Sequence, residues 1–123
     1  MAYDYRIDRD RCVVYVRMSG PLTLPEIRQL ADRLAADPDV TPGIAELIDL
    51  REATAEGVSA DDLRNIAAAT LDSATRRAFV TSDVLTYGLA RMFEIYRELN
   101  RKPDKVAVFR EVAAAETWIA ATS

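Results

Sequence analysis

The residues of this chain that could do chemistry are concentrated in one stretch, LIDLREATAEGVSADDL, residues 47–63. Asp49 and Arg51 lie where an apolar run ends, and the hydroxyls of Thr54 and Ser59 follow them. Because ligands of α/β proteins bind beyond the carboxyl ends of strands, the first pair could hold a small anion or transfer protons. The alternative that we favour is structural: the Asp49 carboxylate accepts backbone hydrogen bonds from the loop, and the Arg51 side chain braces it.

Ser59 also has two interpretations. A phosphate added there would lie at a helix N-terminus, where free N–H groups favour negative charge. The interpretation that we favour is a capping hydroxyl that already accepts from those groups. We take Asp49, Arg51, Thr54, Ser59 and Asp83 together as the candidate ligand or switch loop.

Acidic residues near strand ends and helix starts could form a metal site. Clusters of carboxylate oxygens can hold magnesium or calcium, and the candidates are Asp49, Asp61, Asp62 and Asp83. Aspartate at a helix start is also what capping and the helix dipole favour. We therefore expect no metal and no other cofactor.

Catalysis has few side chains to draw on. The chain has no histidine, and its single cysteine, Cys12, lies in the apolar run CVVYV, where we expect a buried, inert thiol. Nucleophilic triads, histidine bases and the common zinc sites are excluded. An enzyme would depend on Asp, Glu, Lys or Tyr, and no paired constellation of these stands out, so we expect a non-enzymatic protein.

Composition narrows the partners further. The net charge of −4, from 16 basic and 20 acidic side chains, argues against nucleic acid. No run approaches the ~18 apolar residues that a membrane span needs. A lone cysteine permits no internal disulfide, which fits a reducing cytoplasm. We expect a single cytoplasmic domain over residues 1–123.

The elements that position these residues alternate in type. Residues 3–8 and 11–18 alternate apolar and polar side chains and predict a β-hairpin. Thr23 and Glu26 form a capping-box pattern for a helix that ends near residue 37, and residues 44–50 predict a third strand.

The second half continues this alternation. Ser59 and Asp62 repeat the capping pattern for a short helix with Leu63, Ile66, Ala67 and Leu71 inward. A strand over 76–81, a long helix from residue 82 or 83, a strand over 105–109 and a helix over 111–121 complete the chain. In the last helix we expect the inward side chains to be Val112, Ala115, Trp118 and Ile119.

This order predicts a two-layer α/β fold with a mixed five-stranded sheet. Each strand–helix–strand unit should cross over right-handedly, which makes parallel neighbours and leaves the first strand antiparallel at an edge. If the strands follow one another in space, the helices lie mainly on one face. The other face would then be open and would carry side chains such as Val13, Tyr15, Leu47, Phe79 and Phe109.

The long helix has two apolar sides. We expect its core side to hold Leu85, Leu89, Met92, Phe93, Tyr96 and Leu99, and its second side Val84, Tyr87, Arg91 and Ile95. The second side could form a dimer contact or a lid over a cavity, or could pack against neighbouring elements. Gly88 in mid-helix indicates a close approach to the backbone. Basic residues beyond it are expected to stay solvated near the helix C-terminus: Arg97, Arg101, Lys102, Lys105 and Arg110.

Four segments, with the order of elements, resemble the SpoIIAA-like fold of anti-sigma-factor antagonist (STAS) domains, which Sec14-type lipid carriers share distantly. They are SGPLTLPEI (19–27), ELIDLREA (46–53), RRAFVTSDVLTYGLARMFE (76–94) and KVAVFREVAAAETWI (105–119). The resemblance extends over nearly the whole chain and is strongest to a small bacterial family of uncharacterised STAS/Sec14-like single-domain proteins.

The resemblance implies a fold more firmly than a function. In the antagonists, an aspartate that ends the third strand is followed at once by a phosphorylated serine. Asp49 matches that aspartate, but Leu50 and Arg51 stand where the hydroxyl should be, so the phosphoswitch does not carry over.

Two functions remain. The first is a non-enzymatic interaction or regulatory module, expected to be a homodimer that associates through the open sheet face or the long helix, with a protein partner possible. Its interface or lid residues would be Tyr15, Phe79, Tyr87, Arg91, Ile95 and Phe109. The alternative, from the Sec14 side of the resemblance, is a carrier of a small apolar or lipid ligand, which requires a cavity.

Overall fold

The computed structural model describes residues 2–69 and 74–121, and its elements follow the predicted order. The strands and helices are β1 (Ala2–Asp8), β2 (Val13–Pro21), α1 (Leu24–Ala36), β3 (Ile44–Thr54), α2 (Ala60–Ala68), β4 (Ala74–Val80), α3 (Val84–Leu99), β5 (Lys105–Phe109) and α4 (Val112–Ala121).

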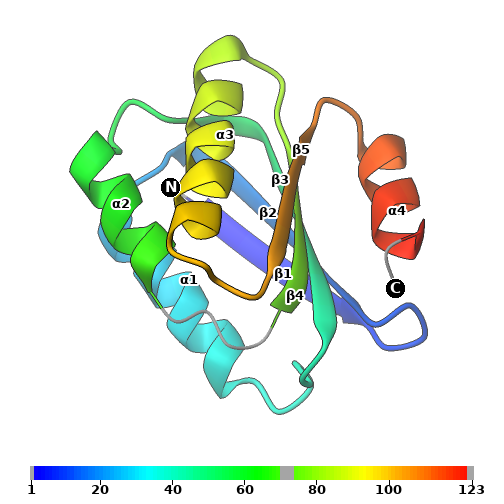
Figure 1. The fold of residues 1–123 in the computed structure, drawn as a ribbon. Coiled ribbons are helices and arrows are strands. Elements are labelled where there is room, and N and C mark those ends of the chain that lie inside the picture. The colour runs from blue at the N-terminus through cyan, green and yellow to red at the C-terminus, as the bar shows by residue number, and fades with distance from the viewer. Residues whose placement is uncertain (1, 70–73, 122–123) are drawn as a thin grey trace.

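The five strands form one mixed sheet in the order β1-β2-β3-β4-β5. Strand β1 pairs antiparallel with β2, and the other neighbours are parallel, as predicted. Right-handed crossovers between sequential parallel strands place α1, α2 and α3 on the same face of the sheet (Figure 1). A sheet in sequential order has no topological switch point, so it lacks the crevice in which open α/β sheets usually bind ligands.

The opposite face is not open, contrary to the prediction, because α4 packs on it (Figure 1). The rule of right-handed crossovers concerns helices that connect two parallel strands, and α4 does not connect any two of these five strands. Tyr15 and Phe109 lie half-buried beneath α4, and the Phe109 ring centroid is 5.8 Å from that of Trp118. Phe79 points to the α1–α3 face instead, where its ring meets Phe93 edge to face at 5.5 Å.

Residues of α4 face the sheet as predicted. Ala115 and Ile119 are buried, and Val112 and Trp118 pack beside them. The sheet presents small side chains here, since Ala45 and Ala78 have no exposed surface. This face is therefore closely packed.

Cys12 departs from its predicted place. It is exposed in the turn between β1 and β2 and has a positive φ of 58°. The apolar run that follows it becomes buried only from Val13 onward, and β2 begins there, so the turn ends two residues later than the alternation indicated.

Strand β3 is longer than the predicted 44–50. It pairs with β4 only as far as Asp49, opposite Val80, and then continues beside β2 to Thr54. A register shift between Arg17 and Ser19 in β2 accompanies this extension. Asp49 therefore lies within a strand, at the point where β4 separates from β3.

The two predicted capping boxes differ. At α2, Ser59 Oγ accepts from the Asp62 N–H at 3.0 Å and Asp62 Oδ2 accepts from the Ser59 N–H at 3.1 Å, so the box is complete. At α1, Thr23 makes no side-chain cap to the backbone, and its hydroxyl donates to Glu26 Oε1 at 2.8 Å instead. Leu63 and Ala67 are buried in α2, and the predicted core residue Leu71 lies outside the described residues.

Helix α3 is turned from its predicted orientation. Its buried side chains are those of Thr86, Ala90, Phe93 and Arg97. Leu85, Met92 and Leu99, which we placed in the core, are exposed. Gly88 is exposed too, and a Cβ there would meet nothing within 4 Å, so no neighbour explains this glycine.

Candidate functional site

The side chains of the predicted pair Asp49 and Arg51 hydrogen-bond to each other. Asp49 Oδ1 accepts from the Arg51 backbone N–H at 3.0 Å and from its Nε at 2.9 Å, and Oδ2 accepts from Nη2 at 2.8 Å. These bonds hold the pKa of Asp49 below its ordinary value despite partial burial. Three hydrogen bonds join the two residues, which fits the structural interpretation.

The other members of the predicted loop also have structural roles. Asp83 caps α3 by accepting from the Thr86 N–H and hydroxyl, each at 2.8 Å, and the hydrogen bond from this N–H lowers the Asp83 pKa. The Ser82 hydroxyl donates to the Arg51 carbonyl at 2.8 Å and so ties the end of β4 to β3. The Thr54 carbonyl accepts from the Leu22 N–H at 2.8 Å, while Ser59 caps α2.

The four aspartates considered for metal binding do not meet. Asp62 and Asp83 serve as caps, Asp49 pairs with Arg51, and Asp61 pairs with Arg64 at 3.0 Å. Across residues 2–69 and 74–121, no group of three or more His, Cys, Asp or Glu side chains could hold an ion.

The predicted interface residues of α3 differ in their exposure to solvent. Ile95 is exposed, and Arg91 is an exposed ion-pair partner of Glu94 at 2.7 Å. Tyr87 is half-buried, and the Arg110 guanidinium lies 4.9 Å from its ring centroid. The exposed apolar face of α3 is instead a stripe of residues three or four positions apart: Val84, Gly88, Met92, Ile95 and Leu99. Leu85 lies next to Val84 and is exposed too.

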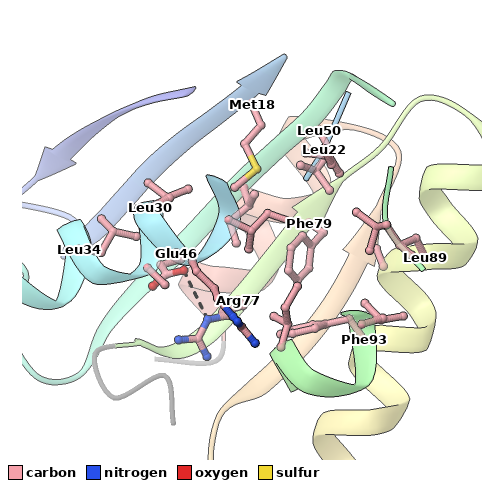
Figure 2. Close-up of a pocket in the computed structure, with 18 of the residues that line it drawn as sticks. Met18, Leu22, Leu30, Leu34, Glu46, Leu50, Arg77, Phe79, Leu89 and Phe93 are labelled. Atoms are coloured by element: carbon pink, nitrogen blue, oxygen red, sulfur yellow. Dashed lines mark ion pairs between the residues drawn. The ribbon is translucent and has the colours of Figure 1, made fainter. Parts of the chain in front are cut away.

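The sequence did not predict the main feature of the molecule, an apolar cavity between the sheet and helices α1, α2 and α3. Its volume is about 390 Å³. Side chains from β2, β3, β4 and all three helices line it. Figure 2 draws many of them and labels Met18, Leu22, Leu30, Leu34, Glu46, Leu50, Arg77, Phe79, Leu89 and Phe93. Arg28 and Asp32, both exposed on α1, also line it, so the cavity reaches the surface beside this helix.

Small side chains on the covering helices leave this space unfilled. Ala31 and Ala35 of α1 and Ala90 of α3 line the cavity at positions where a leucine would fill part of it. Cavities in well-packed proteins are few and small, so an apolar space of this size is unusual.

One end of the cavity is charged. Glu46 and Arg77 lie opposite each other on β3 and β4, with Arg77 Nε 3.4 Å from Glu46 Oε1 (Figure 2). Burial raises the pKa of Glu46 above its ordinary value, against the opposing effect of the Arg77 charge. Within the described residues, Arg77 is the only hydrogen-bonding or ion-pair partner of this carboxylate.

A buried ion network continues behind this pair. Arg77 Nη1 donates to Asp104 Oδ2, and Arg97 Nη2 donates to Asp104 Oδ1 at 2.5 Å. Arg97 also donates to the carbonyls of Ala67 and Ala69, at 3.1 and 2.6 Å, at the end of α2. Arg97 is only 2% exposed, so the prediction that it stays solvated was wrong.

The sequence contains a signal for this charged end. Glu46 and Arg77 are the charged residues on the inward sides of two adjacent central strands, and Ile44, Ile48 and Phe79 are their apolar neighbours on that side. A charge inside a strand that is covered on both faces needs a partner. The alternation alone could not show that the space in front of the pair stays empty, because that depends on how the helices pack.

No family model matches the sequence, and no curated protein matches it. Among solved structures, the fold is similar to that of an uncharacterised protein of the DUF3478 family with a SpoIIAA-like fold, from Shewanella loihica PV-4. The TM-score is 0.62 at 20% identity, over 96% of this chain and 92% of that one. At this identity the similarity shows the fold alone: the chain has a SpoIIAA-like fold. None of the helices in the described part is long and apolar enough to cross a membrane.

Proposed function

We propose that this SpoIIAA-like domain is a non-enzymatic binding protein that carries a small apolar ligand in the cavity beneath α1, α2 and α3. The observation that supports the proposal is the cavity itself: about 390 Å³, lined mainly by aliphatic and aromatic side chains. Pockets for small molecules occupy ~300–1,000 Å³, are mostly apolar and contain a few polar groups that orient the ligand. The cavity has a volume in this range and a mostly apolar lining, and Glu46 and Arg77 are its buried polar groups.

The cost of leaving the space empty also favours a ligand. The cavity reaches the surface, so water can contact its apolar lining, and removing apolar surface from water stabilises by ~25 cal/mol per Å². Alanine at three lining positions keeps the space open, although larger apolar side chains would fill it. A ligand that fills the space would contact this apolar lining and cover it from water.

Binding can be measured with a neutral apolar fluorophore, N-phenyl-1-naphthylamine, whose emission rises in apolar surroundings. The blocking variant combines Ala31→Leu with Ala90→Leu, which adds two bulky groups inside the cavity. Its matched control combines Ala68→Leu with Ala113→Leu, the same change at exposed positions of α2 and α4. We expect saturable binding to the wild type and the control, and at least a tenfold loss in the blocked variant.

Equal binding by the blocked and control variants would place the fluorophore elsewhere and contradict the proposal. Native mass spectrometry of protein purified without denaturation provides a second readout. A persistent added mass that disappears in the blocked variant would support the carrier and identify its natural ligand class.

A second function, self-association, is favoured by the outer side of α3. Val84 and Leu99 are 81% and 70% exposed, and Leu85, Met92 and Ile95 extend the same apolar stripe. Gly88 lies near the middle of the stripe and has open space in front of it, so a second helix could approach closely there. A homodimer in which two copies of α3 cross at Gly88 would cover this surface.

The dimer is tested by light scattering after size-exclusion chromatography. Ile95→Glu combined with Leu99→Glu should shift the wild-type mass from twice the chain mass to one chain. Gln29→Glu, an added charge on the exposed side of α1, is the control and should stay dimeric. A wild type that is monomeric at all concentrations would remove self-association from the proposal.

A further inference from the structure

We infer that the cavity selects ligands with a hydrogen-bond-donating head, a hydroxyl or an amine, on a single apolar body, and that Glu46 accepts from this head. The inference rests on the proposed function and specifies the ligand of the same site. It excludes fatty acids and other carboxylates as preferred ligands.

The acceptor is Glu46 itself. A carboxylate has about four lone-pair positions, and within the described part of the chain the Glu46 group meets only Arg77, over 3.4 Å. Arg77 makes its closer contact with Asp104, behind the cavity wall. Glu46 lies at the cavity end with spare acceptor capacity, and a buried acceptor in that state gains from any donor that reaches it.

The charges around this end oppose a second carboxylate. Glu46 on β3 and Asp104 before β5 carry the negative charges, and Arg77 on β4 and Arg97 on α3 balance them. Arg97 donates to Asp104 and to two backbone carbonyls, so its guanidinium has no pair of N–H groups left to bind a ligand anion. A carboxylate head would add a charge beside Glu46 in a poorly solvated space, and like charges repel strongly there.

The shape of the cavity limits the apolar body. Glu46 and Leu50 lie on the same side of β3, four residues and therefore about 13 Å apart, and Leu50 lies toward the apolar end with Met18 and Leu22 (Figure 2). At about 30 Å³ for each water-sized group, the volume holds an alkyl chain of about a dozen non-hydrogen atoms, or a larger number of aromatic ring atoms, which are packed more closely. Decan-1-ol fits both limits when its hydroxyl points toward Glu46.

The test compares three probes with the same chain: decan-1-ol, decylamine and decanoate. Each displaces N-phenyl-1-naphthylamine at pH 7 from the wild type, from Glu46→Gln and from Glu52→Gln. The last variant makes the same change at an exposed residue of the same strand, outside the cavity. We expect the alcohol and the amine to bind the wild type and Glu52→Gln at least tenfold more tightly than decanoate.

Glu46→Gln should reduce this preference to less than threefold, mainly because decanoate binds better and decylamine worse. Equal binding of all three probes to the wild type, or tighter binding of decanoate, would overturn the inference while leaving the cavity as a binding site. An unchanged preference in Glu46→Gln would overturn it as well. Failure of the fluorophore and of every probe to bind would instead contradict the proposed function.

Discussion

The two faces of the sheet are built in opposite ways. Under α4, small side chains of the sheet meet small side chains of the helix, and Ala45, Ala78 and Ala115 have no exposed surface. Under α1, α2 and α3, small side chains such as Ala90 face an unfilled space that ends in a buried ion pair. The presence of alanine between a helix and the sheet therefore does not show whether the two pack closely or leave a space. What differs is that side chains fill the interface under α4, whereas they leave a space under α1, α2 and α3.

The largest effect should come from the buried ion network, which among the described residues lies on the α1–α3 side alone. Asp104→Ala leaves Arg77 and Arg97 buried without their shared carboxylate, and removing one partner of a buried ion pair costs about 3–5 kcal/mol. Urea unfolding at pH 7 measures the loss.

Glu116→Ala on α4 is the control from the other side. Its carboxylate accepts from the Tyr15 hydroxyl at 3.4 Å and is 41% exposed. Exposed polar contacts contribute less than about 1 kcal/mol. Similar losses in the two variants would contradict the view that the buried charges belong to one face.

The difference in packing predicts that an alanine-to-leucine substitution changes stability differently on the two faces. Ala115→Leu forces a larger group into the closed interface under α4 and should cost about 1–3 kcal/mol. Ala90→Leu makes the same change on α3, where the added group enters the cavity, and should be neutral or stabilising. Urea midpoints compare the two directly. Equal destabilisation would mean that the cavity side is as tightly packed as the other.

A smaller effect concerns the helices that cover the cavity. Ser59→Ala removes a complete capping box from α2 and should cost about 1 kcal/mol. Thr23→Ala should cost less, because the Thr23 side chain caps no backbone group of α1. Thermal unfolding of both variants measures the difference. A larger loss for Thr23→Ala would show that α1 is the better anchored of the two.

The smallest effect is on the pH dependence of stability. Unfolded Glu46 ionises near 4.5, and burial raises its pKa in the folded protein. Between these pKa values the folded protein binds more protons than the unfolded chain, so this group makes stability fall as pH rises. Glu46→Gln should therefore gain stability relative to the wild type as pH rises from 4 toward 7.

The change in free energy between wild type and Glu46→Gln isolates this group. Hydrogen bonds lower the pKa values of Asp37, Asp49 and Asp83. The contribution of these groups to the stability of the protein therefore decreases as pH falls, and it does so equally in the wild type and in Glu46→Gln. A difference that stays constant with pH would show that Glu46 titrates as it does in the unfolded chain.

Local patterns were sufficient for most of the fold. Alternation and capping residues predicted the order of all nine elements, the parallel neighbours and the bounds of the strand over 105–109. The patterns were less reliable where tertiary contacts decide. β3 continues past Asp49 because β2 remains beside it, and α3 is turned so that its leucines at 85 and 99 face outward. Neither choice is visible in a local window.

The candidate site was harder to predict for the same reason. The hydrogen bonds of Asp49, Arg51 and Ser59 are those that the structural interpretation of residues 47–63 predicted. The cavity arises between elements distant in sequence, and only the inward charges Glu46 and Arg77 mark it along the chain. An empty space leaves no residue pattern of its own.

The most direct test is a methyl NMR titration with decan-1-ol, because one spectrum reports on both faces of the sheet. We predict saturable shifts at Leu30, Ile48 and Leu89, which line the cavity, and none beneath α4 at Val13, Leu47 and Ile119. Shifts confined to the exposed stripe of α3, or equal shifts on both faces, would contradict the account.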